Sequence, residues 1–203
     1  MIAIIDYGAG NLFSVQNALC YLNETFCTTR DPAMLQSCDG MILPGVGAFP
    51  DAMRMLRESG LVPVIREEAG RRPLLGICLG MQLLFERGYE FEETEGLGLI
   101  PGAVRKIEAP GLKIPHMGWN DLTILNPCPL TADTRDGDYF YFVHSFLADT
   151  ADENISCYAT YGERIPALVR RGNVYGAQFH PEKSGEAGLL MLKNFARLVN
   201  GRC

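Results

Sequence analysis

The chain has 203 residues, of which 47% are hydrophobic and 21% charged, and its formal net charge at pH 7 is −6. This length suits one well-buried domain, which we expect to span residues 1–203, and is short for two. The composition is typical of a globular protein. The negative charge disfavours nucleic acid as a partner, because nucleic-acid binding needs clustered Lys and Arg.

The sequence leads us to expect neither a membrane-spanning helix nor a signal peptide. No apolar run reaches the roughly 20 residues of a membrane-spanning helix. The apolar segment at residues 1–6 has no basic region before it, unlike a signal peptide. The seven cysteines are scattered and form no Cys-x-x-Cys pair, which disfavours a disulfide framework and a zinc site. We therefore expect a cytoplasmic protein without a bound metal, and no other cofactor is predicted.

The N-terminal part of the chain alternates strand and helix patterns. Asn11 is placed to cap the first helix. Alternation of this kind predicts a parallel sheet with helices on both faces, and an active site at the carboxyl ends of its strands. The predicted strands are 2–6, 25–29, 40–43 and 74–77, and the predicted helices are 12–22, 51–58, 62–69 and one that opens at 81–85.

The C-terminal part has a different pattern. Short strand-like segments follow one another closely, which indicates antiparallel hairpins. We therefore predict a three-layer α/β fold with a mostly parallel central sheet and a smaller antiparallel section. Turns and short strand-like pieces are expected at 96–113, strands at 139–145, 156–161, 167–171 and 174–179, and an amphipathic helix at 186–200.

Residues 73–82 are the most informative segment of the chain. A short apolar strand runs into Gly76-Ile77-Cys78-Leu79-Gly80 and then into a predicted helix. This is the nucleophile-elbow pattern with cysteine in place of serine. Side chains at Gly76 and Gly80 would crowd the sharp turn, and the N-terminus of the following helix favours a thiolate at the sulfur. Cys78 is therefore the predicted nucleophile.

A cysteine nucleophile needs a base, and the chain has only three histidines: His116, His144 and His180. His180 follows an apolar strand, and the next residue, a proline, restricts it to extended geometry. Glu182 can then point the same way and hold the imidazole. We predict His180 as the base and Glu182 as its orienting group. His144 lies in an aromatic strand and is expected to be a positioned or gating residue near the pocket.

These segments carry a family resemblance. Gly-Ile-Cys-Leu-Gly-Met-Gln at 76–82 and Gln-Phe-His-Pro-Glu at 178–182 resemble the two signatures of class I, triad-type glutamine amidotransferases. That resemblance implies a flavodoxin-like fold and an enzyme that hydrolyses glutamine. Further segments are similar to the glutaminase subunits of imidazole glycerol phosphate synthases, and the similarity runs from the first strand to the last helix. These segments are 6–12, 44–47, 115–120, 141–145 and 183–185.

The resemblance implies roles for the candidate residues. Cys78 would attack the side-chain amide carbon of glutamine, His180 would move protons, and Glu182 would orient His180. The backbone N–H of Leu79 would stabilise the oxyanion. A second N–H donor for the oxyanion would come from a strand whose glycines allow a peptide flip. This strand comprises Gly45, Val46 and Gly47.

The resemblance also implies a glutamine-binding set. Gln82 lies one helical turn after the nucleophile and would contact the bound glutamine; the alternative is a solvated helix residue. The backbone of Ser145 and Phe146 would form a second clamp. Many relatives have tyrosine at the Phe146 position, so the hydroxyl is lost here while a backbone contact is kept.

Free ammonia is protonated in water, and the family delivers it to a partner. The implied partner is the (βα)8-barrel cyclase subunit, in a heterodimer that serves histidine biosynthesis. Trp119 is predicted as an interface anchor, although burial in the core is the usual fate of a lone tryptophan. The other predicted interface residues are Asn11, His116, Met117, Asn120 and Lys183.

Other functions remain open from the sequence. The chain could supply ammonia to a related synthase, such as one that makes a sugar amidine or pyridoxal phosphate, although the Pro-His-Met-Gly-Trp-Asn segment at 115–120 disfavours the pyridoxal branch. It could be a cysteine hydrolase with a similar elbow, or a scaffold on the same fold without activity. The narrow pocket implied by Gln82 and the Gly45–Gly47 segment disfavours a peptidase, and the intact Cys78, His180 and Glu182 set disfavours a scaffold.

Overall fold

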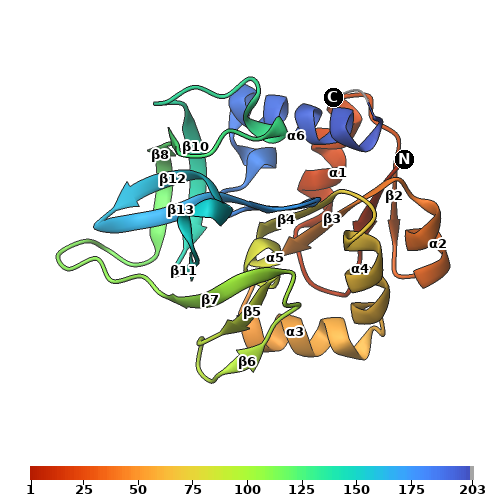
Figure 1. The fold of residues 1–203 in the computed structure, drawn as a ribbon, viewed down its shortest axis with the longest axis horizontal. Helices are drawn as coiled ribbons and strands as arrows, with labels where there is room; N and C mark the ends of the chain where they lie inside the picture. Colours follow the sequence, from red (N-terminus) through yellow and green to blue (C-terminus); the bar gives the residue numbers. More distant parts are fainter. Residues whose placement is uncertain (202–203) are drawn as a thin grey trace.

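The computed structural model describes residues 1–201, and its centre is a mixed sheet of eight strands (Figure 1). Neighbouring strands at one end of the sheet are parallel, and those at the other end are antiparallel. In order across the sheet the strands are β2 (Phe26–Thr29), β1 (Ile2–Ile5), β3 (Gly40–Gly45), β4 (Leu74–Cys78), β14 (Val174–Ala177), β13 (Glu163–Arg171), β12 (Ile155–Tyr161) and β9 (Thr123–Ile124).

Helices cover both faces of the parallel part of the sheet, as the strand and helix alternation predicts (Figure 1). Alternate residues of the strands enter the two cores: Ile5 and Leu43 pack on one side, and Ile4 and Ile42 on the other. The first core is closed by α2 (Pro32–Ser37), α3 (Phe49–Glu58) and α4 (Val62–Ala69), and the second by α1 (Leu12–Tyr21) and α6 (Gly185–Val199).

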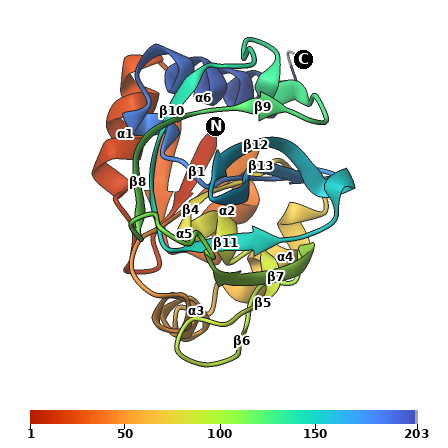
Figure 2. The ribbon, with the colours of Figure 1, turned by 90° about the vertical axis from the view of Figure 1, so that its left-hand side faces the viewer.

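Two smaller sheets complete the fold. A two-stranded ribbon lies at the left of Figure 1 and faces the viewer in Figure 2. The ribbon is formed by β8 (His116–Asp121) and β10 (Tyr139–His144). A sheet of four strands contains β11 (Phe146–Asp149), β7 (Ile100–Lys106), β5 (Phe85–Gly88) and β6 (Thr94–Glu95). Its strands β5 and β6 lie beside α3 (Figure 1). The remaining short elements are α5 (Leu79–Gln82), η1 (Pro129–Thr131), η2 (Asp152–Asn154) and η3 (Pro181–Lys183).

The fold prediction is confirmed, and most element boundaries agree within two residues. The predicted helix at 81–85 is wrong: α5 begins at Leu79 and ends at Gln82, and Phe85 starts strand β5. Helix α2 was not predicted, although its sequence carries a helix start, since Asp31 accepts a hydrogen bond from Ala33 N and Pro32 occupies the first turn. Strand β3 continues through Gly45, two residues beyond the predicted end.

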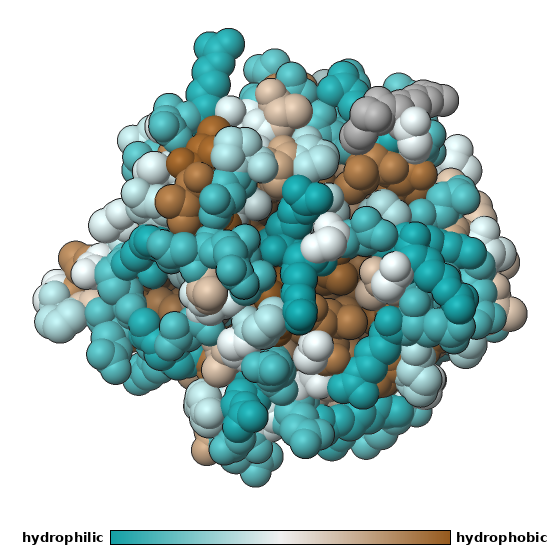
Figure 3. Space-filling view, in the orientation of Figure 1, coloured by the Kyte–Doolittle hydropathy of each residue, from teal (hydrophilic) through white to brown (hydrophobic). Residues whose placement is uncertain are grey.

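The surface seen in Figure 3 is mostly hydrophilic, with smaller hydrophobic areas interrupted by polar side chains. Within residues 1–201, every helix is too short or too polar to cross a membrane. The six cysteines in this range are free thiols; Cys203 lies outside the described residues.

Candidate active site

Cys78 is the last residue of β4 and has backbone angles of φ 55° and ψ −114°. A positive φ is uncommon for a residue with a side chain and stores conformational strain. It also turns the chain sharply from strand to helix, which presents the sulfur at the carboxyl edge of the sheet. The predicted elbow geometry is therefore present at Cys78.

The glycines of the elbow allow backbone to pack directly on backbone. A Cβ atom on Gly76 would lie 2.6 Å from the carbonyl oxygen of Gly80, and one on Gly45 would lie 2.5 Å from the Gly80 nitrogen. A Cβ on Gly80 would overlap the carbonyl oxygen of Leu43 in β3. The crowding predicted from the sequence is confirmed, and it pins the elbow against the neighbouring strand.

The helix after the nucleophile is shorter than the sequence suggests. α5 has only 4 residues, from Leu79 to Gln82, so it amounts to about one turn. The aligned peptide dipoles of a full helix are absent, and the sulfur depends more on its individual neighbours than on a helix N-terminus.

His180 and Glu182 form a buried pair beside Cys78. His180 Nδ1 lies 2.8 Å from Glu182 Oε1, and the two side chains are 3% and 1% exposed. Burial alone would lower the pKa of His180. Hydrogen bonds to Cys78 and Glu182, together with the negative charge of each, outweigh burial and raise that pKa to about 9.

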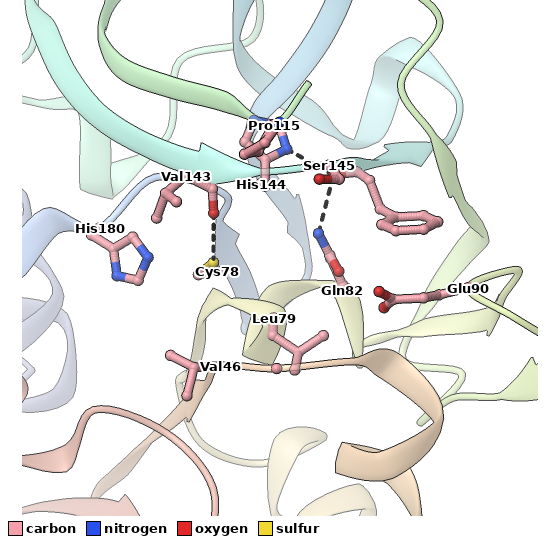
Figure 4. Close-up of a pocket in the computed structure, with 12 residues that line it drawn as sticks. Val46, Cys78, Leu79, Gln82, Glu90, Pro115, Val143, His144, Ser145 and His180 are labelled. Carbon is pink, nitrogen blue, oxygen red and sulfur yellow. Dashed lines mark hydrogen bonds between the residues drawn. The ribbon is translucent and has the colours of Figure 1, made fainter. Parts of the chain in front are cut away.

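A residue outside the predicted set also contacts the sulfur. The Nε2 atom of Gln178 donates to Cys78 Sγ at 3.9 Å, and the Gln178 side chain is completely buried. Its Oε1 accepts a hydrogen bond of 2.9 Å from Gln82 Nε2. The Cys78 thiol can donate to the carbonyl oxygen of Val143, also at 3.9 Å (Figure 4). Gln178 belongs to the segment that carries the histidine, but no local pattern assigns it this contact.

A cavity of about 330 Å³ opens over the sulfur. Cys78 and His180 line one end of it, and Ser145 lies at another part (Figure 4). The second predicted clamp residue, Phe146, also lines the cavity. Gln82 also lines the cavity, and its Nε2 donates to the Phe146 carbonyl at 3.1 Å. The structure therefore brings Cys78, His180 and the predicted glutamine-binding residues to one cavity, and Glu182 contacts His180 without lining the cavity.

Glu90 is a second residue that sequence reasoning missed. Its carboxylate points toward the cavity from the side away from the sulfur (Figure 4). Glu90 Oε2 accepts a hydrogen bond of 2.8 Å from Phe49 N, which holds the side chain in place. Nothing in the sequence separates Glu90 from the other acidic residues that follow it, because its position depends on the fold of β5 and α3.

The predicted oxyanion strand lies at the rim of the cavity. Gly45 ends β3, whereas Val46 is 46% exposed and lines the cavity with Gly47. Gly47 has φ +102°, and a Cβ there would meet open space. Leu79, the residue after the nucleophile, lines the same cavity.

The predicted interface residues differ in exposure. Met117 and Trp119 point outward from β8 and are 65% and 55% exposed, so the core alternative for Trp119 is wrong. Lys183 is exposed on η3, and Asn11 caps α1 by accepting a hydrogen bond of 3.3 Å from Ser14 N, as predicted.

The other two predicted interface residues face inward. His116 is only 3% exposed, so its side chain is not available to a docking partner. Asn120 is half-buried and donates to the Thr160 carbonyl at 3.0 Å. Within residues 1–201, His, Cys, Asp and Glu side chains form no group of three or more that could hold a metal ion.

Sequence comparison gives consistent relatives. The family model for class-I glutamine amidotransferases matches residues 3–199. An imidazole glycerol phosphate synthase subunit HisH from Bacillus anthracis (strain A0248) is 52% identical over 200 residues, which cover 98% of this chain and 95% of the relative. The HisH subunit from Bacillus thuringiensis (strain Al Hakam) is 51% identical over the same share of each chain.

Solved structures show the same fold at lower identity. A crystal structure of a glutamine amidotransferase matches with a TM-score of 0.77 and 21% identity, covering 98% of each chain. The structure of PurLQS from Thermotoga maritima matches with a TM-score of 0.72 and 24% identity, covering 96% of each chain. With the family match over nearly the whole length and a cysteine elbow in the expected place, the chain belongs to the class-I glutamine amidotransferase family.

Proposed function

We propose that this chain hydrolyses glutamine to glutamate and ammonia. It passes the ammonia to a cyclase subunit that forms imidazole glycerol phosphate and aminoimidazole carboxamide ribonucleotide, a step of histidine biosynthesis in the cytoplasm. The observation that carries this proposal is Cys78 on a strained elbow beside the buried His180–Glu182 pair. The relatives at 51–52% identity that are named HisH supply the choice of synthase.

The chemistry follows from the three side chains. The Cys78 thiolate attacks the side-chain amide carbon of glutamine, and the carbonyl oxygen becomes an oxyanion. His180 donates its proton to the amide nitrogen, so the C–N bond breaks and ammonia leaves with a thioester remaining on Cys78. The neutral imidazole then takes a proton from water, whose oxygen attacks the thioester and releases glutamate. Glu182 holds the imidazole through Nδ1 at 2.8 Å during both steps.

The oxyanion needs donors at the rim of the cavity. The backbone N–H of Leu79 is one candidate, because this residue directly follows the nucleophile. A peptide flip within Gly45, Val46 and Gly47 would add a second. The exposed Val46 and the unhindered Gly47 leave room for such a flip, which is a two-state element that partner binding could control.

The cavity has the groups that an amino-acid amide requires. Gln82 and the backbone of Ser145 and Phe146 lie where they can hold glutamine, and Glu90 supplies a negative charge for the α-ammonium group. Phe146 has no hydroxyl, so its contribution to binding is through the backbone.

The docking surface of the proposed heterodimer includes Met117 and Trp119 on β8, and Asn11 and Lys183 lie at further points of the same contact. An exposed aromatic next to an exposed methionine is typical of a protein interface. The proposed partner is a (βα)8-barrel cyclase. A direct channel to it would keep ammonia from being protonated in water before it reacts.

Reconstitution tests the proposal. Glutamate release should be near zero for the isolated chain and should rise by orders of magnitude when the cyclase subunit and its nucleotide ligand are both added. Cys78→Ala should abolish that activity. A glutamine-like electrophile should label the wild-type chain at Cys78 and should not label the Cys78→Ala chain at that position. A complex that forms but releases no glutamate above the Cys78→Ala level would contradict the proposal.

A further inference from the structure

Two buried histidines have no part in the chemistry described above. His116 and His144 are 3% and 6% exposed, and they lie directly opposite one another in the β8–β10 ribbon. His116 Nδ1 and His144 Nε2 are 2.9 Å apart, and His144 Nδ1 is 2.7 Å from the Phe146 carbonyl oxygen. His116 is also stacked between the rings of Phe142 and Tyr161, with centroid distances of 4.8 Å and 4.2 Å.

The chemistry of these groups fixes the direction of each hydrogen bond. A carbonyl oxygen only accepts, so His144 Nδ1 must carry the hydrogen that faces Phe146. In a neutral ring the other nitrogen then accepts, and the hydrogen between the two rings must belong to His116 Nδ1. His116 Nε2 therefore accepts, and Asn120 Nδ2 lies 3.2 Å from it as the donor.

The amide of Asn120 is oriented independently of the histidines. Its Oδ1 accepts from Asp121 N at 3.0 Å, and its Nδ2 also donates to the Thr160 carbonyl at 3.0 Å. Burial lowers the pKa of His116 to about 4 and that of His144 to about 3, so both rings are neutral at physiological pH. We call Asn120, His116, His144 and the Phe146 carbonyl the histidine relay. Each hydrogen bond in the relay can have only one of its two groups as the donor.

The histidine relay ends at the glutamine pocket. The Phe146 carbonyl accepts from His144 and, at 3.1 Å, from Gln82 Nε2, so both of its lone pairs are used (Figure 4). The other end is Asn120 on β8, the strand that exposes Met117 and Trp119. A single hydrogen-bond chain thus joins the exposed ribbon to the backbone that would clamp the substrate.

We propose that His116 and His144 are positioning residues that hold the glutamine-binding backbone at Phe146. The inference rests on the proposed glutaminase function. His144 lines the cavity and bonds the Phe146 carbonyl, and His116 supports His144 from behind, so the two rings set the orientation of the Phe146 peptide and of the Gln82 amide. Loss of the relay therefore weakens glutamine binding more than it slows the chemical step.

Two substitutions at His144 test its Nδ1 and Nε2 hydrogen bonds one at a time. Asparagine places an amide near the Nδ1 position and keeps a donor for Phe146, whereas glutamine reaches the Nε2 position and loses that donor. In the complex with the cyclase, His144→Gln should raise KM for glutamine about tenfold and leave kcat within about threefold. His144→Asn should keep KM within about threefold of wild type. Equal effects of both substitutions on KM, or a loss confined to kcat, would overturn the inference.

Two further measurements distinguish loss of the histidine relay from a general loss of structure. Thr131→Val removes a buried hydroxyl of η1 that bonds the backbone of Cys128, the residue before η1, and it should leave KM unchanged. Nitrogen NMR of the wild-type chain, which has three histidines, should show His116 and His144 as neutral Nδ1–H tautomers at pH 7. Either ring as the Nε2–H form or as imidazolium overturns the relay. An inactive wild-type complex would instead refute the proposed function and leave the NMR result to decide the relay.

Discussion

The imidazole Nδ1 of His180 lies 2.8 Å from Oε1 of Glu182, and both side chains are almost completely removed from water. An ionised carboxylate only accepts hydrogen bonds, so Glu182 holds the proton on Nδ1 and directs Nε2 toward the sulfur of Cys78. The same contact helps to keep the imidazole protonated, so in the proposed mechanism His180 can protonate the leaving amide nitrogen.

Removal of either partner should stop glutamine hydrolysis. His180→Ala removes the proton carrier and should lower kcat at least about 10³-fold, whereas Glu182→Gln should lower it about 10²- to 10⁴-fold by disturbing the imidazole. The measurement is glutamate release by the complex with the cyclase. His144→Ala is the comparison, and it should keep a measurable rate. Equal losses for His144→Ala and His180→Ala would contradict the assignment of the base.

The raised pKa of His180 predicts that the folded state loses stability in alkali. Burial opposes protonation, but Cys78 and Glu182 raise the pKa from 6.5 to about 9. Between these values only the folded state holds the proton, so this contribution is complete below pH 6.5 and is lost as pH rises through 9. Urea titrations from pH 6 to pH 10 should show the free energy of unfolding falling, by at most about 1.4 kcal/mol per pH unit for one proton. His180→Gln should flatten this slope, and an unchanged slope would contradict the pKa shift.

The two relay histidines predict the opposite trend in acid. Burial lowers the pKa of His116 to about 4 and that of His144 to about 3, so between these values and 6.5 the unfolded chain binds protons that the folded chain excludes. The free energy of unfolding should therefore rise with pH from about 4 to 6.5. His144→Asn should make this rise in the free energy of unfolding less steep in the same urea titrations. If the variant keeps the wild-type dependence of unfolding free energy on pH in acid, His144 is not buried in its neutral form.

The elbow glycine Gly80 should tolerate no side chain. A Cβ there would overlap the Leu43 carbonyl, and the strand and the elbow cannot separate without opening the core. Gly80→Ala should lower the free energy of unfolding by about 3 kcal/mol or more, measured by urea denaturation. Gly70→Ala is a matched control, since its Cβ would lie 3.5 Å from the Glu67 carbonyl oxygen at an ordinary helix end, and it should change stability by less than about 1 kcal/mol. Similar losses for the two variants would refute the packing argument.

Local sequence was sufficient for the parts of the fold and site that depend on neighbours along the chain. Cys78 lies between its two glycines, and Glu182 lies two residues from His180, so short motifs contained both the elbow and the orienting pair. The segment around Phe85 was predicted as part of a helix, and that prediction is wrong because a short apolar run fits a helix or a strand equally well. Phe85 pairs with Ile100 in β7, and this pairing makes the segment a strand. The local sequence pattern does not contain that long-range contact.

Residues whose position depends on distant contacts could not be predicted. His116 and His144 are 28 positions apart, and Gln178 and Cys78 are 100 apart. His116 was assigned to the interface because it stands in the same segment as Trp119. In a strand, alternate side chains point to opposite sides, so the two residues separate into the core and the surface.

Trp119 should contribute much of the affinity for the cyclase. It is 55% exposed, and its edge-to-face contact with Tyr141, at 6.1 Å between ring centroids, leaves most of the ring free to enter an interface. Trp119→Ala should raise the Kd of the complex about 30-fold without a large change in Tm, as measured by calorimetry. Tyr21→Ala removes an aromatic ring that is 74% exposed at the end of α1, and it should leave the Kd unchanged. An affinity unaffected by Trp119→Ala would place the interface elsewhere.

Gln178 should promote the reactivity of Cys78, because its Nε2 donates toward the sulfur from a fully buried position and a donor stabilises a thiolate. Gln178→Glu keeps the acceptor for Gln82 but replaces the donor that faces the sulfur with a carboxylate oxygen. Alkylation of Cys78 by iodoacetamide at pH 7, followed by mass spectrometry of its peptide, should slow about tenfold or more, and kcat should fall in proportion.

The same substitution at Gln16 provides the control for this experiment. Gln16 Nε2 donates to Thr28 Oγ1 at 2.8 Å, between α1 and β2, so Gln16→Glu changes an equivalent amide outside the cavity. It should leave the alkylation rate of Cys78 at the wild-type value. With a helix of one turn behind it, the sulfur has few other donors that could take over. A Gln178→Glu chain that alkylates at the wild-type rate would therefore assign thiolate stabilisation to His180 alone.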